Sequence, residues 1–166
     1  MTEPIDRAAA ARSSLATLVE AESGLLLAVA RTLIGPGLEA EDVVQETLER
    51  ALRNLDQLRD PKALRAWLLR IEVREAFRLR RRFRRRMSFQ GTLREIAVGD
   101  EPHAERVAVH GALARLTPRV RTAVALHHLA GLPVSDVALA MGVSPNTVKS
   151  QLKIGTAQLR ELLRDG

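Results

Sequence analysis

The sequence has no cysteine and no tyrosine, and its other aromatic residues amount to only 2% of the 166 positions. Without cysteine there can be no disulfide scaffold, no thiolate metal site and no cysteine nucleophile. Four histidines and the lack of a glycine-rich phosphate loop leave few groups from which to build a catalytic site. We therefore expect a protein that is not an enzyme, with no catalytic residues, no metal and no cofactor.

Long apolar runs are also missing. No uninterrupted stretch approaches the roughly 18 apolar residues of a membrane-spanning helix. Residues 1–6 lack the basic patch and following apolar run that mark a secretory signal. The sequence therefore predicts a cytoplasmic protein with no membrane insertion.

Strand signals are nearly absent, whereas helix signals are abundant. The chain has no Asn-Gly hairpin turn and no sustained alternation of β-branched residues. Leu, Ala, Val and Arg dominate, and apolar residues recur at helical spacing. Because hydrophobic residues make up 46% of the chain, a buried core is expected, and the fold class is predicted to be all-α.

Apolar spacing predicts three helices in the first half of the chain. Gly35-Pro36-Gly37 stops the first helix, and acidic residues near 39–42 suit the positive end of the second. Their expected buried positions are Leu15, Leu18, Val19, Leu25, Leu26, Val29, Leu33 and Ile34, then Val44, Leu48, Leu52 and Leu55, and finally Leu64, Trp67, Leu68 and Ile71.

Residues 88–103 have the composition of a linker, because glycine, proline and acidic residues replace the apolar spacing. A linker there divides the chain into two small helical domains. The expected divisions are an N-terminal tail and helix start over 1–19, a first domain over 20–87, the linker over 88–103 and a second domain over 104–166. The second domain should hold four helices, near 104–115, 118–130, 134–141 and 145–164.

Charge is distributed unevenly along the chain, although the net charge is only +6. Residues 1–60 carry a net charge of −5, whereas residues 61–94 carry +10 and residues 106–166 carry +5. Basic blocks indicate nucleic acid, and arginine binds phosphate well because its planar group donates two parallel hydrogen bonds. An acidic block beside two basic ones predicts two kinds of partner, although solvated helix faces would also give such blocks.

Residues 134–153 (VSDVALAMGVSPNTVKSQLK) have the pattern of a helix-turn-helix. Gly142 supplies a left-handed turn, Ser144 caps the second helix and Pro145 occupies its first position. Val148 and Leu152 are expected to point inward. The outward face of the recognition helix then carries Ser144, Asn146, Thr147, Lys149, Ser150 and Lys153, which suit the major groove.

Arg119 and Arg121 follow Thr117-Pro118, a pair that can cap and start a helix. We expect both arginines to contact DNA phosphates, which position a protein without specifying sequence. Two solvated arginines are an equally good interpretation of the same residues.

The order of these motifs resembles that of the bacterial extracytoplasmic-function sigma factors. The resemblance rests on residues 41–48 (EDVVQETL), 66–71 (AWLLRI), 116–119 (LTPR) and 142–150 (GVSPNTVKS), and it covers roughly 20–87 and 104–164. It implies a dissociable initiation subunit of bacterial core RNA polymerase that binds promoter DNA. It also implies an anti-sigma factor as regulator and a monomer when free.

The resemblance assigns three groups of residues. For core polymerase these are Asp42, Gln45, Glu46 and Glu49, whose acidic character independently makes them poor DNA ligands. For the minus-ten promoter element they are Arg59, Arg70, Arg74, Arg78 and Arg81. For the minus-thirty-five element they are Arg119, Arg121, Ser144, Asn146, Thr147, Lys149, Ser150 and Lys153.

The sequence departs from the family pattern in the minus-ten helix. Arg74 and Arg78 stand where members commonly have Asn and Asp, and the preceding loop over residues 56–61 lacks the aromatic often found there. Trp67 and Phe77 are expected to pack in the core, while Phe83 and Phe89 could either pack or stack on bases.

Two other functions fit parts of the sequence. A stand-alone helix-turn-helix regulator would have a similar recognition segment, but the strand-containing sensor domain usual in such regulators is not evident. A sigma-like decoy that titrates an anti-sigma factor would explain the altered minus-ten helix, but not the intact recognition helix with Lys149 and Lys153.

Overall fold

The computed structural model describes residues 4–35, 38–90 and 104–164, and these residues contain helices but no strands. The α-helices are α1 (Pro4–Ile34), α2 (Ala40–Arg53), α3 (Leu64–Gln90), α4 (Ala104–Arg115), α5 (Pro118–Val124), α6 (Val134–Met141) and α7 (Pro145–Arg164). Two 3-10 turns, η1 (Leu55–Gln57) and η2 (Pro61–Ala63), lie between α2 and α3, and the π-helical segment η3 (Ala125–Leu129) continues α5. The all-α prediction is confirmed for the described residues.

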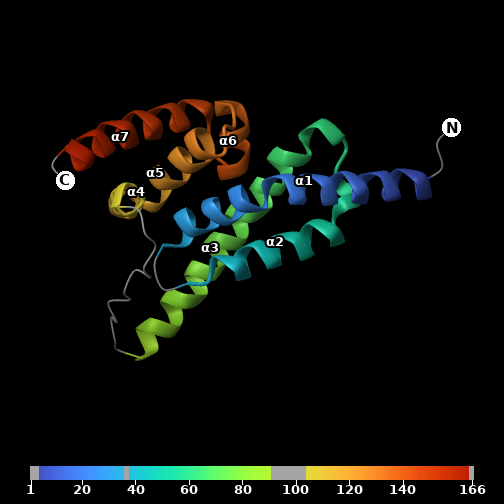
Figure 1. Ribbon diagram of the computed structural model, residues 1–166, viewed down its shortest axis with the longest axis horizontal. Helices are drawn as coiled ribbons and strands as arrows, with labels where there is room; N and C mark the ends of the chain where they lie inside the picture. The colour runs from blue at the N-terminus through green and yellow to red at the C-terminus, as the bar shows by residue number, and fades with distance from the viewer. Residues whose placement is uncertain (1–3, 36–37, 91–103, 165–166) are drawn as a thin grey trace.

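Helices α1, α2 and α3 pack on one another and form the first half of the molecule (Figure 1). Helix α1 begins at Pro4 and spans 31 residues, so within residues 1–19, expected to hold a tail and the start of the first helix, the helix begins at residue 4. It ends before Gly35, whose φ of 74° is the left-handed conformation that glycine adopts without strain. An ion pair between Arg65 and Glu22, with both carboxylate oxygens within 2.8 Å of Nε, ties α3 to α1.

The buried side of α2 differs from the expected one. Leu52 is 53% exposed, and Val44 and Leu48 are only partly buried. The fully buried positions are one residue earlier along the helix, at Ala40, Val43, Thr47 and Ala51. Two of these residues are alanines and one is a threonine that donates a hydrogen bond to the carbonyl of Val43, so small side chains let α2 lie close to α1 and α3.

Helix α3 is buried on more than the one side that apolar spacing predicts. Leu68 and Ile71 lie in the core as expected, and Trp67 and Phe77 pack partly buried against it. Leu69, Val73, Ala76 and the carboxylates Glu72 and Glu75 are buried as well. Helix α3 is buried on several sides because α1, α2 and α6 all pack on it.

Helices α4 to α7 form the second half. The predicted helix over 118–130 is present, but its hydrogen bonding changes from α to π at Ala125. The helix-turn-helix consists of α6, Gly142 with a φ of 67°, and α7. Gly155 in α7 permits a close approach to α5, because a Cβ there would lie 2.5 Å from Cγ2 of Val124.

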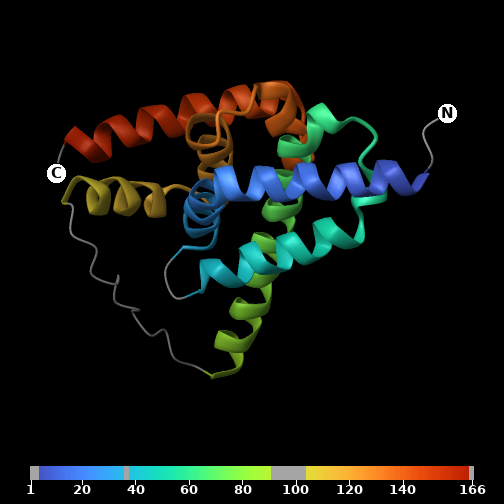
Figure 2. The same ribbon diagram turned by 45° about the vertical axis from the view of Figure 1, so that its right-hand side comes forward.

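The two halves pack directly against each other. Helix α6 lies beside α3, and α1 contacts both α5 and η3 (Figures 1 and 2). Leu126, Leu132 and Val137 from the second half belong to the same buried cluster as Leu33 and Leu69 from the first. Most of the expected linker, over 91–103, lies outside the described residues.

By length and composition alone, the segment Arg7–Ile34 of α1 is long and apolar enough to cross a membrane. This was not predicted from the sequence, because the criterion was an uninterrupted apolar run, and charged residues such as Arg12, Glu20 and Glu22 interrupt this segment. Leu26, Val29 and Leu33 of this helix nevertheless pack in the core against α2 and α3, as in a core helix of a folded domain.

Candidate protein and nucleic-acid interfaces

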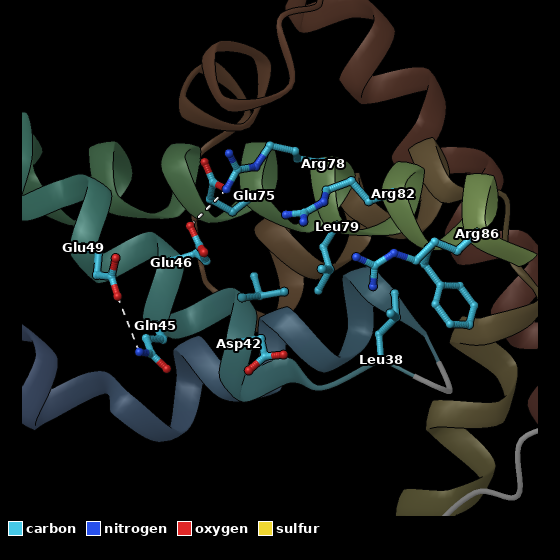
Figure 3. Close-up of a pocket in the computed structure, with 12 residues that line it drawn as sticks. Leu38, Asp42, Gln45, Glu46, Glu49, Glu75, Arg78, Leu79, Arg82 and Arg86 are labelled. Atoms are coloured by element: carbon cyan, nitrogen blue, oxygen red, sulfur yellow. Dashed lines mark hydrogen bonds and ion pairs between the residues drawn. The ribbon is translucent and has the colours of Figure 1, made fainter.

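A groove of about 400 Å³ runs between α2 and α3 (Figure 3). We call it the α2–α3 groove, and twelve residues line it: Leu38, Asp42, Val43, Gln45, Glu46, Glu49, Glu75, Arg78, Leu79, Arg82, Phe83 and Arg86. Acidic side chains of α2 form one wall, arginines of α3 form the other, and apolar side chains lie between them. All four residues expected to bind core polymerase are exposed on the α2 wall.

Ion pairs join the two walls at one end of the groove. Arg78 lies 3.0 Å from Glu46 and 2.7 Å from Glu75, and Arg50 lies 2.7 Å from the other oxygen of Glu75. Glu75 is only 3% exposed, and these two arginines are the charged partners of its buried carboxylate. The Arg78 guanidinium, which the family resemblance assigned to minus-ten DNA, is thus directed toward α2 and held by two carboxylates.

Glu72 is a buried carboxylate that was not predicted from the sequence. Neither of its carboxylate oxygens has a hydrogen-bond partner among the described residues, and burial raises the pKa of Glu72 to about 9. The side chain is therefore protonated and neutral near pH 7. Its position one turn beyond Leu68 was the only available signal, because helical spacing places residues 68 and 72 on the same side.

The remaining minus-ten candidates are accessible. Arg59, Arg74 and Arg81 are exposed, and Arg70 is partly exposed. Positions 70, 74 and 81 share one side of α3 at helical spacing, so their guanidinium groups can follow one phosphate backbone.

The loop that holds Arg59 is fixed by two hydrogen bonds. The Asp60 carboxylate accepts from the backbone nitrogen of Lys62 at 2.9 Å, which caps η2. Arg7 of α1 donates to the carbonyl oxygen of Arg59 at 3.2 Å. The beginning of α1 therefore helps position this loop beside α3.

The helix-turn-helix has the predicted local structure. The Ser144 hydroxyl accepts a hydrogen bond from the backbone nitrogen of Thr147 at 3.1 Å, which caps α7, and Val148 is completely buried. Asn146, Lys149, Ser150 and Lys153 are exposed together with Ser144, while Thr147 is partly buried and lies 2.9 Å from the Ser144 hydroxyl. A polar surface of α7 thus faces away from the core, where a DNA groove can reach it.

Arg119 and Arg121 have different environments. Arg119 is exposed, as a phosphate contact requires. Arg121 is only 6% exposed and donates hydrogen bonds to the carbonyl oxygens of Leu113, Ala114 and Leu116 at 2.7–2.9 Å. Burial, followed by the charge of Arg80, lowers the pKa of Arg121. This guanidinium holds the end of α4 and is not available to DNA in this conformation, because helix-terminal carbonyls need such donors.

Metal-ligating residues are not clustered in the part of the chain that the structure describes: no three His, Asp or Glu side chains are placed to hold an ion. His127 and His128 contact each other edge to face, with ring centroids 4.8 Å apart. His127 Nδ1 lies 2.8 Å from the carbonyl oxygen of Leu132, which gives this histidine a packing role.

Known protein families match both halves. The family model for sigma-70 region 2 matches residues 18–86, and the model for sigma-70 region 4 matches residues 106–159. Among curated proteins, the ECF RNA polymerase sigma factor SigL of Mycobacterium tuberculosis is 31% identical, over 97% of this chain and 96% of the relative. The RNA polymerase sigma factor SigV of Bacillus subtilis is also 31% identical, over 69% of each chain.

Solved structures have the same arrangement of helices. The sigma factor RpoE from Bartonella quintana, crystallised with the anti-sigma factor NepR, superposes with a TM-score of 0.83 and 26% identity, over 90% of this chain and 96% of that chain. CnrH, solved with the cytosolic domain of CnrY, superposes with a TM-score of 0.68 and 26% identity, over 95% of both chains.

Proposed function

Because the chain belongs to the extracytoplasmic-function family of RNA polymerase sigma factors, we propose that it binds core polymerase through the α2–α3 groove and promoter DNA through α3 and α7. As a sigma factor it directs bacterial core RNA polymerase to specific promoters for transcription initiation. The chain itself carries out no catalysis, because the polymerase performs the chemistry, and it acts in the cytoplasm as a monomer when free. The observation that supports this most is that one chain combines an acidic, exposed α2 with a separate, capped recognition helix.

Core polymerase is proposed to contact the α2 wall of the groove. Asp42, Gln45, Glu46 and Glu49 follow one another at intervals of one helical turn or less and are all exposed, so a partner helix can contact them together. Carboxylates repel DNA phosphates, which leaves a basic protein surface as the partner that fits. The apolar residues between the walls, such as Leu79 and Phe83, offer the partner a surface to bury.

Minus-ten DNA is proposed to follow the exposed arginines of α3 and the adjoining loop. Arg59, Arg70, Arg74 and Arg81 supply the positive charge that attracts phosphate. Arg78 acts in this proposal by holding Glu46 and Glu75 in place, and thus contributes to the shape of the groove.

The minus-thirty-five element is proposed to receive α7 in its major groove. The first turns of α7 present Asn146, Lys149, Ser150 and Lys153, with amide, hydroxyl and ammonium groups that bind base edges or phosphates. Arg119 is proposed to contact the neighbouring phosphate backbone.

An anti-sigma factor is proposed as the regulator of this chain. The match to RpoE, which was crystallised with the anti-sigma factor NepR, supports a similar partner here. Such a partner would have to cover the α2–α3 groove or the recognition surface of α7 in order to block initiation.

The deciding experiment is a titration of fluorescently labelled protein with bacterial core RNA polymerase, in which fluorescence anisotropy measures binding. We expect tight, saturable binding that another sigma factor displaces. A folded, helical sample that does not bind core polymerase would exclude the initiation role and leave a stand-alone DNA regulator or an anti-sigma decoy.

A further inference from the structure

A second hollow, of about 560 Å³, lies between the C-terminal part of α3 and the start of α5. We call it the arginine cleft, and it is lined by Phe77, Arg80, Arg81, Arg84, Arg85 and Pro118. Five of these residues come from the first half of the molecule, and Pro118 comes from the second. The arginine cleft therefore lies at the junction of the two halves, on a different side of α3 from the α2–α3 groove.

The positive charge of the arginine cleft is not neutralised within the described part of the molecule. No carboxylate lines the cleft, and the ion pairs of the described residues join other arginines to carboxylates. Of the four arginines in the cleft, Arg80 donates to the carbonyl oxygen of Leu33 at 3.0 Å, which is a neutral partner. Burial, followed by the charge of Arg84, lowers the pKa of Arg80, as expected where guanidinium groups crowd together.

The spacing of the arginines fits closely spaced phosphates. Positions 80, 81, 84 and 85 lie on one side of α3 within about 7.5 Å of helix length, at 1.5 Å per residue. Each guanidinium group can donate two parallel hydrogen bonds to the oxygens of one phosphate. Four guanidinium groups within about 7.5 Å of helix can therefore hold two or more adjacent phosphate groups. Phosphates joined through a shared oxygen match this density better than those of DNA, which are separated by sugars.

The size and lining of the arginine cleft suit a small ligand. Its volume lies within the range of roughly 300–1,000 Å³ that is typical of small-molecule sites. Pro118 of the second half borders the cleft beside the arginines of α3. Phe77 adds an aromatic side chain to the lining, and aromatic side chains favour stacking with a nucleobase.

We propose that the arginine cleft binds a nucleoside polyphosphate, with its phosphates on Arg81, Arg84 and Arg85 and its base against Phe77. Because the cleft has walls from both halves, the bound ligand stabilises their packed arrangement. Arg81 is also a proposed minus-ten DNA contact, so the ligand and promoter DNA compete for this residue. The binding itself does not depend on the proposed initiation function, since it can be measured without polymerase.

The test is isothermal titration of the full chain at about 150 mM salt with ATP, GTP, inorganic tripolyphosphate and AMP. We expect saturable one-to-one binding of the triphosphates, and at least tenfold weaker binding of AMP. The Arg84→Ala/Arg85→Ala variant is expected to bind ATP at least tenfold more weakly. The matched control Arg12→Ala/Arg160→Ala removes the same charge from exposed positions on α1 and α7, and its affinity should stay within about twofold of the unmodified chain.

A further variant separates the two parts of the site. Phe77→Leu should weaken ATP binding severalfold while leaving tripolyphosphate binding unchanged, because leucine keeps an apolar side chain against the core but removes the aromatic face that stacks on a base. Circular dichroism checks that each variant is folded. Lack of saturable binding by any triphosphate would overturn the proposal, as would equal losses in the Arg12/Arg160 control, which would indicate diffuse charge attraction. If minus-ten DNA did not displace ATP at any concentration, the shared role of Arg81 would be overturned.

Discussion

At the scale of single residues, burial changes the role that a charged side chain would have on the surface. Arg119 and Arg121 are two positions apart in the sequence, yet one is exposed and the other caps the end of α4. Glu72 shows the same effect for an acid, since it occupies a position of α3 that spacing alone would give to an apolar residue. Tertiary packing decided both cases; the sequence carried no signal for Arg121, and for Glu72 only its helical spacing from Leu68.

Replacing Glu72 with leucine should change how stability depends on pH. The folded-state pKa of about 9 lies above the ordinary value of 4.5, so between these values the folded chain keeps a proton that the unfolded chain releases. Protonated Glu72 therefore makes its full contribution to the free energy of unfolding below about pH 4.5, and this contribution is lost as the pH rises toward 9. Between these limits the loss is about 1.4 kcal/mol per pH unit.

Urea denaturation of the Glu72→Leu variant and the unmodified chain at several pH values measures this effect. The variant should be more stable at pH 8, and its advantage should shrink as the pH falls toward 5. A difference in the free energy of unfolding that does not vary with pH would show that Glu72 is ionised in the folded protein.

Lys149→Ala should weaken promoter binding and lower its salt dependence. If the exposed ammonium group contacts one phosphate, the slope of log affinity against log salt should fall by about one unit. Fluorescence anisotropy with promoter duplex at several salt concentrations measures the slope. Arg160→Ala, farther along α7, serves as control, and an unchanged slope for Lys149→Ala would remove this residue from the DNA interface.

At the scale of helices, their existence and most boundaries could be predicted from the sequence, whereas the buried side of α2 could not. Large residues at Val44, Leu48 and Leu52 indicated one side, but the helix buries the side that carries Ala40 and Ala51. A prediction from apolar spacing relies on large apolar side chains, whereas close packing of two helices requires small side chains between them. The caps of α1 and α7 were predicted correctly because Gly35 and Ser144 act through local backbone geometry.

Gly155→Ala tests the close packing of α7 on α5. A Cβ at this position would lie 2.5 Å from Cγ2 of Val124 and 2.9 Å from Cγ1 of Val120, so the helices must move apart. We expect a loss of about 1–3 kcal/mol in the free energy of unfolding. Gly24→Ala in α1 is the control, since nothing lies within 4 Å of its added Cβ, and it should stabilise the chain by roughly 0.5–1 kcal/mol. A neutral Gly155→Ala would contradict the packing of these two helices.

The α2 wall is tested by Gln45→Ala combined with Glu46→Ala. Core polymerase binding should weaken at least tenfold, because the exposed polar contacts are removed, while binding of isolated promoter duplex should persist. Anisotropy titrations measure both affinities. Gln158→Ala with Glu161→Ala removes the same chemical groups from exposed positions on α7 and should leave core binding intact. If the α2 variant lost both activities, misfolding would be the cause.

At the scale of the whole molecule, the sequence predicted two helical units but not their contact. Charge blocks and the linker composition divided the chain, whereas the packing of α6 on α3 depends on surfaces that only the folded halves present. The two promoter elements lie about 25 base pairs apart, or roughly 85 Å at 3.4 Å per base pair. Because α3 and α7 are proposed to bind these two separate elements, we predict that the packed halves move apart when the chain binds a promoter together with core polymerase.

Separation of the halves can be followed by energy transfer between two labels. The chain contains no cysteine, so Leu52→Cys on α2 and Ile154→Cys on α7 provide two unique exposed sites. Transfer should be efficient in the free protein and fall when core polymerase and promoter DNA are added together. Efficiency that stays constant through productive initiation would show that the halves remain packed.

The surface of α7 also has an evolutionary consequence. Asn146, Lys149, Ser150 and Lys153 are exposed, while the same helix is anchored from its other side by Val148 and by Gly155. Mutations at the outer positions therefore encounter little selection for stability. A duplicated copy of this gene could drift toward new promoters through a few substitutions, while both copies kept the same fold.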